Sequence, residues 1–434
     1  MRKLAFTRLV DRSFAFADPR DRKRFGSLTR KKRREAKESR SLCSAPHHLR
    51  LIIFRLVQSL SEYLPRPGLS TPIVTILSPK GEVLEQEQRA AVRYIIQGGR
   101  GADILFAAGT TGEWDRMDNR GRQTVSRIVV DECRRVSLAI GRRIEAWVGV
   151  TAHTRTETLA NLKYAIELDC DAAVVAPLSI RDASSPPDFV EREVGGLLEK
   201  LGRTIPIFLY DNADIAAPGK SPHLHTRDVK RMARLEYVRG VKVTAGKAVL
   251  GNYTRAASHF KLSHEFAIYA GDPYLIFDLF APAEGIAGSL RHRWNRYVTQ
   301  RSMPYGVVAG PANVLPREWQ RAWRVCRAGN SELIVRYGGA VERLGAACTF
   351  KRAGKPYVPV IACYKAALKE LGVVESDAVA RATPSLEAAE RQEFAARVAR
   401  MFERNAESLE PGWVSEYDAH PALERAPGVL RGHG

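Results

Sequence analysis

From Thr71 onward, short runs of β-branched and small apolar residues alternate with amphipathic segments of helical length. This alternation is typical of βαβ units around a parallel sheet, whose strands are buried on both faces. Eight runs qualify as strands: residues 73–76, 104–108, 144–150, 172–176, 207–210, 238–243, 266–270 and 305–309. Eight such units favour an α/β fold of the closed (β/α)8 TIM-barrel type over an open sheet.

The hydrophobic pattern also divides the chain into four parts. Residues 1–67 lack apolar periodicity and include the run RKKRR at 30–34, so we expect a basic, disordered extension. The barrel is expected at 68–316. Residues 317–405 have helical periodicity alone and predict a helical C-terminal extension. Residues 406–434, which contain several prolines and glycines, predict a loose tail.

Composition agrees with a globular chain: 45% of its 434 residues are hydrophobic and 27% are charged. The net charge of +20 raises nucleic acid as a partner. Residues 1–60, however, hold seventeen basic and five acidic residues, so +12 of that charge lies there. A nucleic-acid arm, a targeting leader and a solvated extension remain open for this segment, although its acids are unusual for a transit peptide. Nucleic acid is not the expected partner of the barrel.

Cysteine spacing and hydropathy exclude other classes. The six cysteines form no CxxC pair and have no histidine at ligand spacing, which argues against a zinc site and a disulfide framework. No apolar run approaches the roughly 18–20 residues of a membrane span. We therefore expect no metal, no membrane partner and a cytoplasmic location.

In a parallel barrel the active site lies at the carboxyl ends of the strands, where Lys242 and Tyr210 are found. Lys242 lies between Val241 and Val243 in the run 238–243, where desolvation favours the neutral, nucleophilic amine. Tyr210 ends the preceding strand, and its phenol could transfer protons. A lysine at a strand end and a core tyrosine are the alternative interpretations of these two residues.

The strand at 104–108 is followed by the sequence GTTGE at 109–113. Exposed backbone N–H groups and the hydroxyls of Thr110 and Thr111 could bind a carboxylate there, with Gly109 and Gly112 allowing close approach. An ordinary strand-to-helix turn is the alternative interpretation.

Several motifs occur together in one order: Thr71-Pro72, GTTGE at 109–113, Leu209-Tyr210, Gly240-Val241-Lys242 and Gly271-Asp272, followed by GVVA at 306–309 and ANVLP at 312–316. In this the chain resembles the dihydrodipicolinate synthase / N-acetylneuraminate lyase family of class I pyruvate-dependent aldolases, from about residue 71 to residue 372. The GTTGE motif with the ordered tyrosine and lysine makes the resemblance specific.

The resemblance implies a role for each matching residue. Lys242 would form a Schiff base with a 2-oxo acid, Tyr210 would shuttle protons, and Thr110 would relay to Tyr210. Thr111, with the backbone of Gly109 and Gly112, would hold the substrate carboxylate. It also implies that no metal or organic cofactor is required, and that the protein is a homo-oligomer, either a dimer or a tetramer.

Three departures from the family pattern affect the choice of substrate. Ser179 stands where the family usually has the second tyrosine of its proton relay. Ile215 replaces the arginine that binds the second substrate's carboxylate in the synthases. Residues 284–303, where the family passes almost directly between strands, contain Arg291, His292, Arg293 and Arg296; we favour a solvated loop over an acidic-substrate site.

The sequence thus predicts a carbon–carbon lyase or synthase that joins a 2-oxo acid such as pyruvate to an aldehyde, or cleaves the product. The alternative is a catalytically decayed barrel that binds a small molecule, because fold alone does not guarantee activity.

Overall fold

The computed structural model describes residues 63–257, 265–281, 285–298 and 303–416, all within one compact unit, Leu60–Gly434. Most of the basic extension and the last eighteen residues lie outside this range. The predictions of disorder, nucleic-acid binding or targeting for residues 1–62 therefore remain untested.

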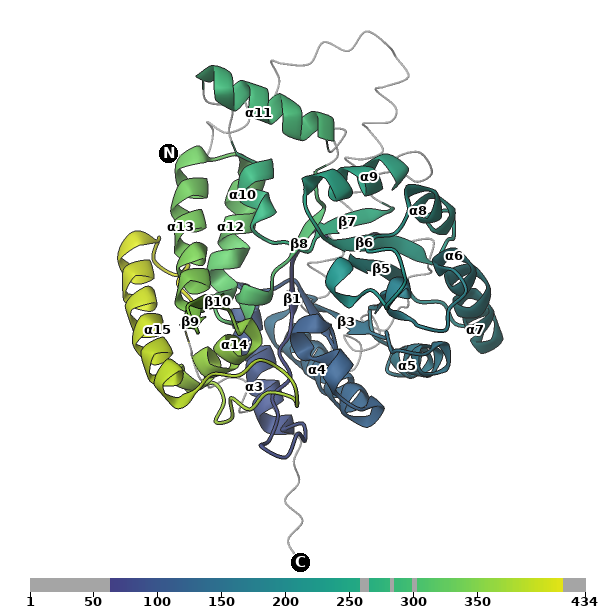
Figure 1. Cartoon of the computed structure of the whole chain (residues 1–434), viewed down its shortest axis with the longest axis horizontal. Helices are drawn as coiled ribbons and strands as arrows, with labels where there is room; N and C mark the ends of the chain where they lie inside the picture. Colours follow the sequence, from purple (N-terminus) through teal and green to yellow (C-terminus); the bar gives the residue numbers. More distant parts are fainter. Residues whose placement is uncertain (1–62, 258–264, 282–284, 299–302, 417–434) are drawn as a thin grey trace, which may run out of the picture. The chain divides into compact units, whose positions relative to one another are not determined.

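Eight parallel strands close into a barrel in sequence order, each paired with its neighbours and β8 paired with β1 (Figure 1). The TIM-barrel prediction is confirmed. The strands are β1 (Gly68–Pro72), β2 (Ile104–Ala107), β3 (Glu145–Gly149), β4 (Ala172–Val175), β5 (Ile207–Asn212), β6 (Val238–Thr244), β7 (Ala267–Ala270) and β8 (Gly306–Val308).

The predicted position of the first strand is wrong. The apolar run 73–76 follows the strand, and β1 is Gly68–Pro72, whose Ser70 pairs with Ile104 of β2 and Val308 of β8. Gly68 has φ +147°, and a Cβ there would lie 2.2 Å from an Asp103 carboxylate oxygen, so only glycine fits. Hydrophobicity alone could not reveal a strand that contains Gly, Ser, Thr and Pro.

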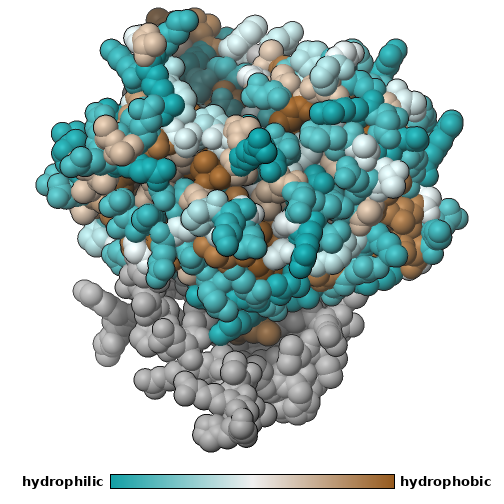
Figure 2. Space-filling view, turned by 60° about the horizontal axis from the view of Figure 1, so that its bottom comes forward, coloured by the Kyte–Doolittle hydropathy of each residue, from teal (hydrophilic) through white to brown (hydrophobic). Residues whose placement is uncertain are grey.

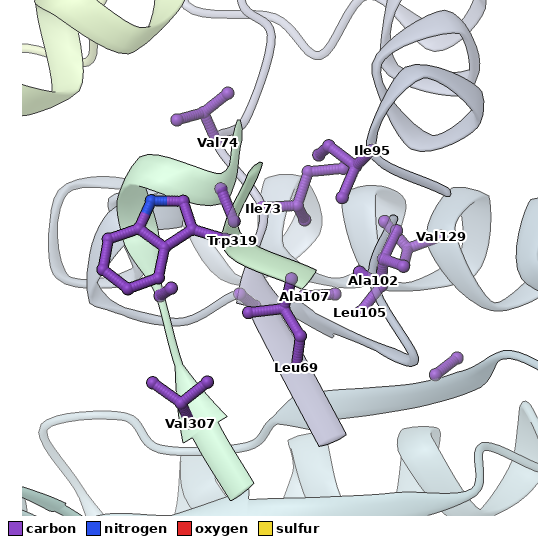
Figure 3. Packing of buried hydrophobic residues seen from close by; sticks show 14 of the residues in the cluster. Leu69, Ile73, Val74, Ile95, Ala102, Leu105, Ala107, Val129, Val307 and Trp319 are labelled. Carbon is purple, nitrogen blue, oxygen red and sulfur yellow. The ribbon is translucent and has the colours of Figure 1, made fainter. Parts of the chain in front are cut away.

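Side chains alternate between the barrel interior and the surrounding helices, as the two-residue period of a strand requires. The interior holds a separate cluster that includes Phe106, Trp147, Phe208, Tyr210 and Tyr269. The alternate residues point outward into the main core. Figure 3 shows Leu69 and Val307 from the strands beside Trp319 of the C-terminal region, and all three are fully buried. Two cores thus share one set of strands.

Helices follow the strands around the barrel. They are α3 (Glu85–Ile96), α4 (Asn119–Ile140), α5 (Arg155–Glu167), α6 (Pro186–Asp188), α7 (Gly195–Leu201), α8 (Thr226–Met232), α9 (Lys247–Ala257), α10 (Leu275–Leu279) and α11 (Gly285–Val298). Several begin with a side-chain cap; the Asp118 carboxylate accepts a bond from Gly121 N before α4, and Thr154 accepts one from Glu157 N before α5.

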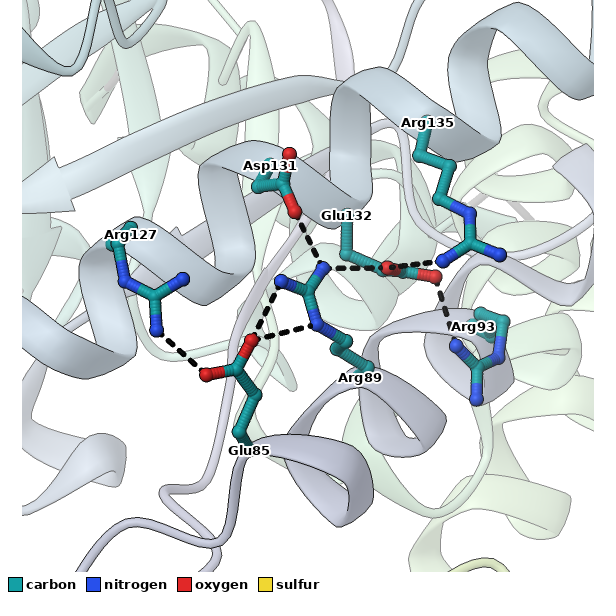
Figure 4. A network of polar contacts seen from close by, with 7 residues as sticks. All are labelled: Glu85, Arg89, Arg93, Arg127, Asp131, Glu132 and Arg135. Atoms are coloured by element: carbon teal, nitrogen blue, oxygen red, sulfur yellow. Dashed lines mark hydrogen bonds and ion pairs between the residues drawn. The ribbon is translucent and has the colours of Figure 1, made fainter. Parts of the chain in front are cut away.

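A network of ion pairs joins α3 to α4 (Figure 4). Arg89 contacts the carboxylates of Glu85, Asp131 and Glu132 at 2.8, 2.6 and 2.9 Å. The side chain of Glu132 is fully buried and also contacts Arg93 at 2.9 Å. The Arg127 and Arg89 guanidinium groups lower the pKa of Glu85 to about 2. These helices are therefore held by charge as well as by apolar packing.

The C-terminal region consists of α12 (Pro316–Ala328), α13 (Ser331–Ala347), α14 (Val360–Glu370) and α15 (Ala388–Ser408). A helical C-terminal extension was predicted correctly. It also contains a two-stranded antiparallel hairpin, β9 (Phe350–Arg352) with β10 (Lys355–Tyr357), which the helical pattern missed. Its first helix packs beside β1 and α3, close to where the Tyr94 hydroxyl donates to the Val314 carbonyl at 2.7 Å.

The chain after α15 is not loose as far as residue 416. The Arg321 guanidinium group donates two hydrogen bonds of 3.0 and 2.8 Å to the Glu410 carboxylate. The buried Glu318 carboxylate accepts bonds from the amide and hydroxyl of Ser415, which in turn accepts one from Arg317 N at 3.1 Å. Polar spacing alone could not predict these anchors, because their partners lie far away in the sequence.

The predicted loop at 284–303 is wrong for most of its length, because residues 285–298 form the helix α11. Arg291 and Arg293 are both exposed on this helix. Asn295 is buried and donates to the Asp278 carbonyl at 2.8 Å, which ties α11 to α10.

The face seen in Figure 2 is mainly hydrophilic, with small hydrophobic patches. Among the described residues, no helix is both long enough and apolar enough to cross a membrane.

Candidate active site

Lys242 lies inside the barrel near the carboxyl end of β6. Its register partners are Tyr210 on β5 and Tyr269 on β7, so all three point inward. The residue is only 6% exposed. Its Nζ lies 4.0 Å from the ring centroid of Tyr210 and 5.3 Å from that of Phe106. The amine is thus held over aromatic faces, a contact favourable for a cation.

The Tyr210 hydroxyl has two polar neighbours. Thr110 Oγ1 lies 3.2 Å away, within hydrogen-bond distance, and Asn212 Nδ2 donates to the phenol oxygen at 3.1 Å. Thr110 comes from the loop after β2, and Asn212 lies two residues beyond Tyr210 on the same strand face. The structure therefore brings together Lys242, Tyr210 and Thr110, which the sequence singled out, and adds Asn212.

Burial alone would raise the pKa of Tyr210, but the positive charge of Lys242 and the hydrogen bond with Thr110 outweigh it, so the pKa lies below the usual 10. A phenol with a lowered pKa gives up and regains a proton more readily near neutral pH. The pair can therefore exchange protons at a site sheltered from water.

An aromatic layer closes the barrel beneath the amine. The rings of Trp147 and Phe208 stack at 4.2 Å, and Tyr269 meets them edge-on at 5.0 and 5.7 Å. All three are at most 1% exposed. Small molecules must consequently reach Lys242 from the carboxyl ends of the strands.

The GTTGE loop forms a 3-10 turn, η3 (Thr110–Gly112), at that end of the barrel. A Cβ on Gly109 would lie 2.8 Å from the Phe106 ring, and one on Gly112 would lie 2.9 Å from the Ile73 carbonyl oxygen. Close packing thus requires glycine at both positions, which gives these two residues a structural role in the turn. Thr111 Oγ1 lies beside Gly310, after β8, at 3.5 Å from where a Cβ would stand.

Glu113, the last residue of this motif, points away from the barrel interior into the C-terminal region. Its carboxylate contacts Lys365 Nζ of α14 at 2.5 Å, and both side chains are fully buried. It also accepts bonds from Ala380 N at 2.8 Å and Thr383 Oγ1 at 2.7 Å. Burial lowers the pKa of Lys365, against the opposing effect of Glu113. The C-terminal region therefore holds the site loop in place.

Asp211 also holds a loop of the site in place, from the outward face of β5. It alternates with Tyr210 and Asn212, so its buried carboxylate points outward, where it contacts His223 Nδ1 at 2.7 Å and accepts from Leu224 N at 2.9 Å. This fixes the loop that follows Tyr210.

The departures from the family pattern lie at the same end. Ser179 follows β4, is 2% exposed, and its hydroxyl has no hydrogen-bond partner among the described residues. Ile215 follows β5 and packs against the interior cluster. The two altered positions therefore carry a buried hydroxyl after β4 and an apolar side chain after β5.

Two residues at this site were missed by sequence reasoning. Asn212 could have been found from its two-residue spacing to Tyr210, which places both on one face of a strand. Lys365 carried no such signal, because it lies 252 residues from its partner. Within the described ranges, no group of three or more His, Cys, Asp or Glu side chains could hold a metal ion.

Comparison with known proteins agrees with this geometry. Residues 66–175 match the model of the dihydrodipicolinate synthetase family. No curated protein sequence matches the chain.

Solved structures of similar fold include a dihydrodipicolinate synthase from Bacteroides thetaiotaomicron, with 20% identity, TM-score 0.61, and coverage of 78% of this chain and 99% of that one. YagE, a prophage protein of the dihydrodipicolinic acid synthase family from E. coli K12 in complex with pyruvate, has 17% identity, TM-score 0.59 and coverages of 77% and 98%. KD(P)GA from T. tenax has 20% identity, TM-score 0.58 and coverages of 78% and 99%. At these identities the likeness establishes the fold. The match of residues 66–175 to the family model agrees with the family resemblance of the motifs.

Proposed function

We propose that this protein is a class I aldolase, acting as a lyase or synthase on a 2-oxo acid such as pyruvate and an aldehyde, with Lys242 as the Schiff-base amine. One observation carries the proposal: the buried Nζ of Lys242 lies against Tyr210, whose hydroxyl lies within hydrogen-bond distance of Thr110. Nucleophile, proton carrier and relay are then in contact, as imine chemistry requires.

The reaction follows from the electron demand of the imine. The Lys242 ammonium group passes a proton to the Tyr210 phenolate, the neutral amine attacks the carbonyl carbon, and Tyr210 returns the proton that lets the hydroxyl leave as water. The iminium then withdraws electrons, so the adjacent carbon loses a proton to give a neutral enamine. In synthesis the enamine adds to the aldehyde carbon and water releases the product; cleavage is the reverse.

The GTTGE loop supplies the binding site for the substrate carboxylate in this proposal. Thr111 and the backbone of Gly109 lie at the carboxyl end of the barrel, where backbone N–H groups can face an anion, while Gly112 N donates to the Gly109 carbonyl at 2.9 Å and shapes the turn. Thr110 relays protons to Tyr210. The chemistry needs no metal or organic cofactor.

We propose that the aldehyde substrate has no carboxylate group that would lie beside Ile215. An isoleucine cannot form the bidentate contact that an arginine makes with a carboxylate. The free hydroxyl of Ser179 instead suits an uncharged polar group. We therefore expect little or no turnover of pyruvate with aspartate semialdehyde in a coupled assay; a rate typical of dihydrodipicolinate synthases would contradict this.

Borohydride trapping tests the role of Lys242. Protein incubated with pyruvate and then reduced should carry a secondary amine on the peptide that contains Lys242, and Lys242→Ala should carry none. Lys247→Ala is the matched control, because that lysine pairs with Asp278 outside the barrel interior and its loss should leave trapping intact. Absence of an adduct with every 2-oxo acid tested would favour the decayed, ligand-binding barrel.

The assembly state is a separate proposal. The family resemblance leads us to expect a dimer or tetramer, and light scattering on the intact chain measures this directly. A monomer at working concentration would refute it without affecting the chemistry.

A further inference from the structure

A cleft of about 260 Å³ lies between α13 and α15 in the C-terminal region. Its lining is unusually cationic: four arginines, two alanines and a methionine, with no carboxylate, namely Arg343, Ala346, Ala347, Arg397, Arg400, Met401 and Arg404. Figure 1 shows α13 and α15 side by side, on the opposite flank of the molecule from α5 to α7.

Two of the four arginines donate hydrogen bonds to neutral acceptors. Arg343 donates to Asn405 Oδ1 at 3.1 Å and to Ser408 Oγ at 3.2 Å. Arg397 donates to the carbonyl oxygens of Ala347 and Thr349 at 3.1 and 2.7 Å. The acceptors of Arg343 are neutral and orient its guanidinium group without cancelling its charge, whereas Arg397 also pairs with Glu393. The cleft therefore contains oriented cations, which costs less side-chain entropy when a ligand binds.

The side chains that line the cleft carry an excess of positive charge. Arg397, Arg400 and Arg404 follow one face of α15 at spacings of three and four residues, where like charges repel. In the part of the chain that the structure describes, Arg397 pairs with Glu393, but Arg343, Arg400 and Arg404 have no carboxylate within 4.0 Å. Three of the four arginines are therefore available to an anion in the cleft.

We propose that the cleft binds a small phosphate-bearing ligand with at least two negative charges, such as a diphosphate or a phosphomonoester. Guanidinium groups match phosphate oxygens with two parallel hydrogen bonds, and four of them around one volume favour a multiply charged ligand. The volume holds several water molecules, at about 30 Å³ each in the liquid, so a small molecule fits. This binding site is separate from Lys242 and does not depend on the proposed aldolase reaction.

The local sequence argues for a small molecule over nucleic acid. Nucleic-acid sites present an extended positive face that follows many phosphates. On α15 the cationic stretch is short, because Glu393 precedes it and Glu407 follows it on the same side of the helix. The positive charge is therefore confined to the length of the cleft.

Isothermal titration of the full-length protein with inorganic pyrophosphate, at constant ionic strength maintained with chloride, tests the proposal. Arg400→Gln combined with Arg404→Gln should weaken binding about tenfold or more, because each removes a charge-assisted contact. Both side chains are exposed, so the fold should persist, which circular dichroism checks. The matched control is Arg192→Gln, which removes a charge at a side chain 76% exposed outside the cleft and should bind as wild type does.

The same titration distinguishes the sources of affinity. Pyrophosphate should bind more tightly than phosphate or sulfate, because it carries more negative charge and more oxygens that can accept from guanidinium groups. The proposal is overturned if the wild-type protein does not bind pyrophosphate, if the control loses as much affinity as the double variant, or if a single-stranded oligonucleotide of equal charge binds more tightly than pyrophosphate.

Discussion

The two ends of the barrel interior each bury an ionisable side chain beside a tyrosine hydroxyl. At the carboxyl ends of the strands, Lys242 lies against Tyr210. At the amino ends, the Glu145 carboxylate accepts a bond from Trp147 Nε1 at 3.0 Å and lies 3.5 Å from the Tyr63 hydroxyl. Burial, reinforced by the charge of Asp171, raises the pKa of Glu145 to about 7.

The difference lies in what surrounds each group. Around Tyr210 the neighbours are small and polar, Thr110 and Asn212, and they come from a loop and a strand end. Around Glu145 they are large rings, and Tyr63, only 5% exposed, packs in the same interior cluster. A group with a shifted pKa thus lies at both ends of the barrel, Tyr210 at the carboxyl end and Glu145 at the amino end. Only at the carboxyl end do small polar side chains suited to a substrate lie beside it. Burial of a charge alone does not identify a catalytic site.

The largest expected difference between the two ends is in proton transfer. Tyr210→Phe should slow exchange of the pyruvate methyl protons with deuterium oxide by roughly 10² to 10⁴, because it removes the proton carrier and keeps the amine. Borohydride trapping on Lys242 should persist at a lower rate. Nuclear magnetic resonance of pyruvate measures the exchange without any aldehyde. Tyr63→Phe is the control at the amino ends of the strands. An equal loss of exchange rate in that variant would contradict the difference between the two ends.

The next largest effect should come from the ion pair by which the C-terminal region holds the GTTGE loop at the carboxyl end of the barrel. Lys365→Met leaves Glu113 buried without its cation and should lower the free energy of unfolding by about 3–5 kcal/mol. Adding Glu113→Gln should recover much of this loss, since no uncompensated charge is left. Urea unfolding monitored by circular dichroism measures both variants. Equal stability of the single variant and the wild type would mean that the pair does not hold the loop.

At the lower end we expect an effect of pH on stability. The folded protein raises the pKa of Glu145 from 4.5 to about 7. The protonated Glu145 side chain therefore contributes fully to the free energy of unfolding below about pH 4.5, and this contribution is lost as the pH rises through 7. Glu145→Gln should remove up to about 3 kcal/mol of this decline in unfolding free energy and leave pyruvate exchange unchanged. Urea unfolding at several pH values measures the slope. The exposed Glu332→Gln should keep the wild-type slope.

The smallest effect should come from Asn212, which we regard as a positioning residue for Tyr210. Asn212→Ala removes one hydrogen bond to the phenol, worth about 1 kcal/mol, so exchange should slow by roughly fivefold to tenfold. The pH at which exchange is half-maximal should rise, because the phenolate loses a donor. Asn212→Ser should restore part of the rate. A slower rate with an unchanged pH profile would indicate a purely structural role.

Local patterns in the sequence determined much of this protein. Alternating apolar runs and helical segments were enough to predict the barrel, and the strand ends pointed to Lys242, Tyr210 and Thr110, which the structure brings together. The reason is that a strand's two-residue period and the parallel order of the barrel already place such residues at one end. Their chemical roles stay predictions until trapping and exchange are measured.

Tertiary structure alone decided which distant residues meet. The pairing of Glu113 with Lys365 crosses 252 positions, the tail at 409–416 is tied to α12, and β1 lies before the apolar run that predicted it. The four arginines of the cleft come from two helices that nothing in the spacing brings together. Periodicity reports only which side of its own helix or strand a residue occupies, whereas these contacts depend on how separate helices and strands pack.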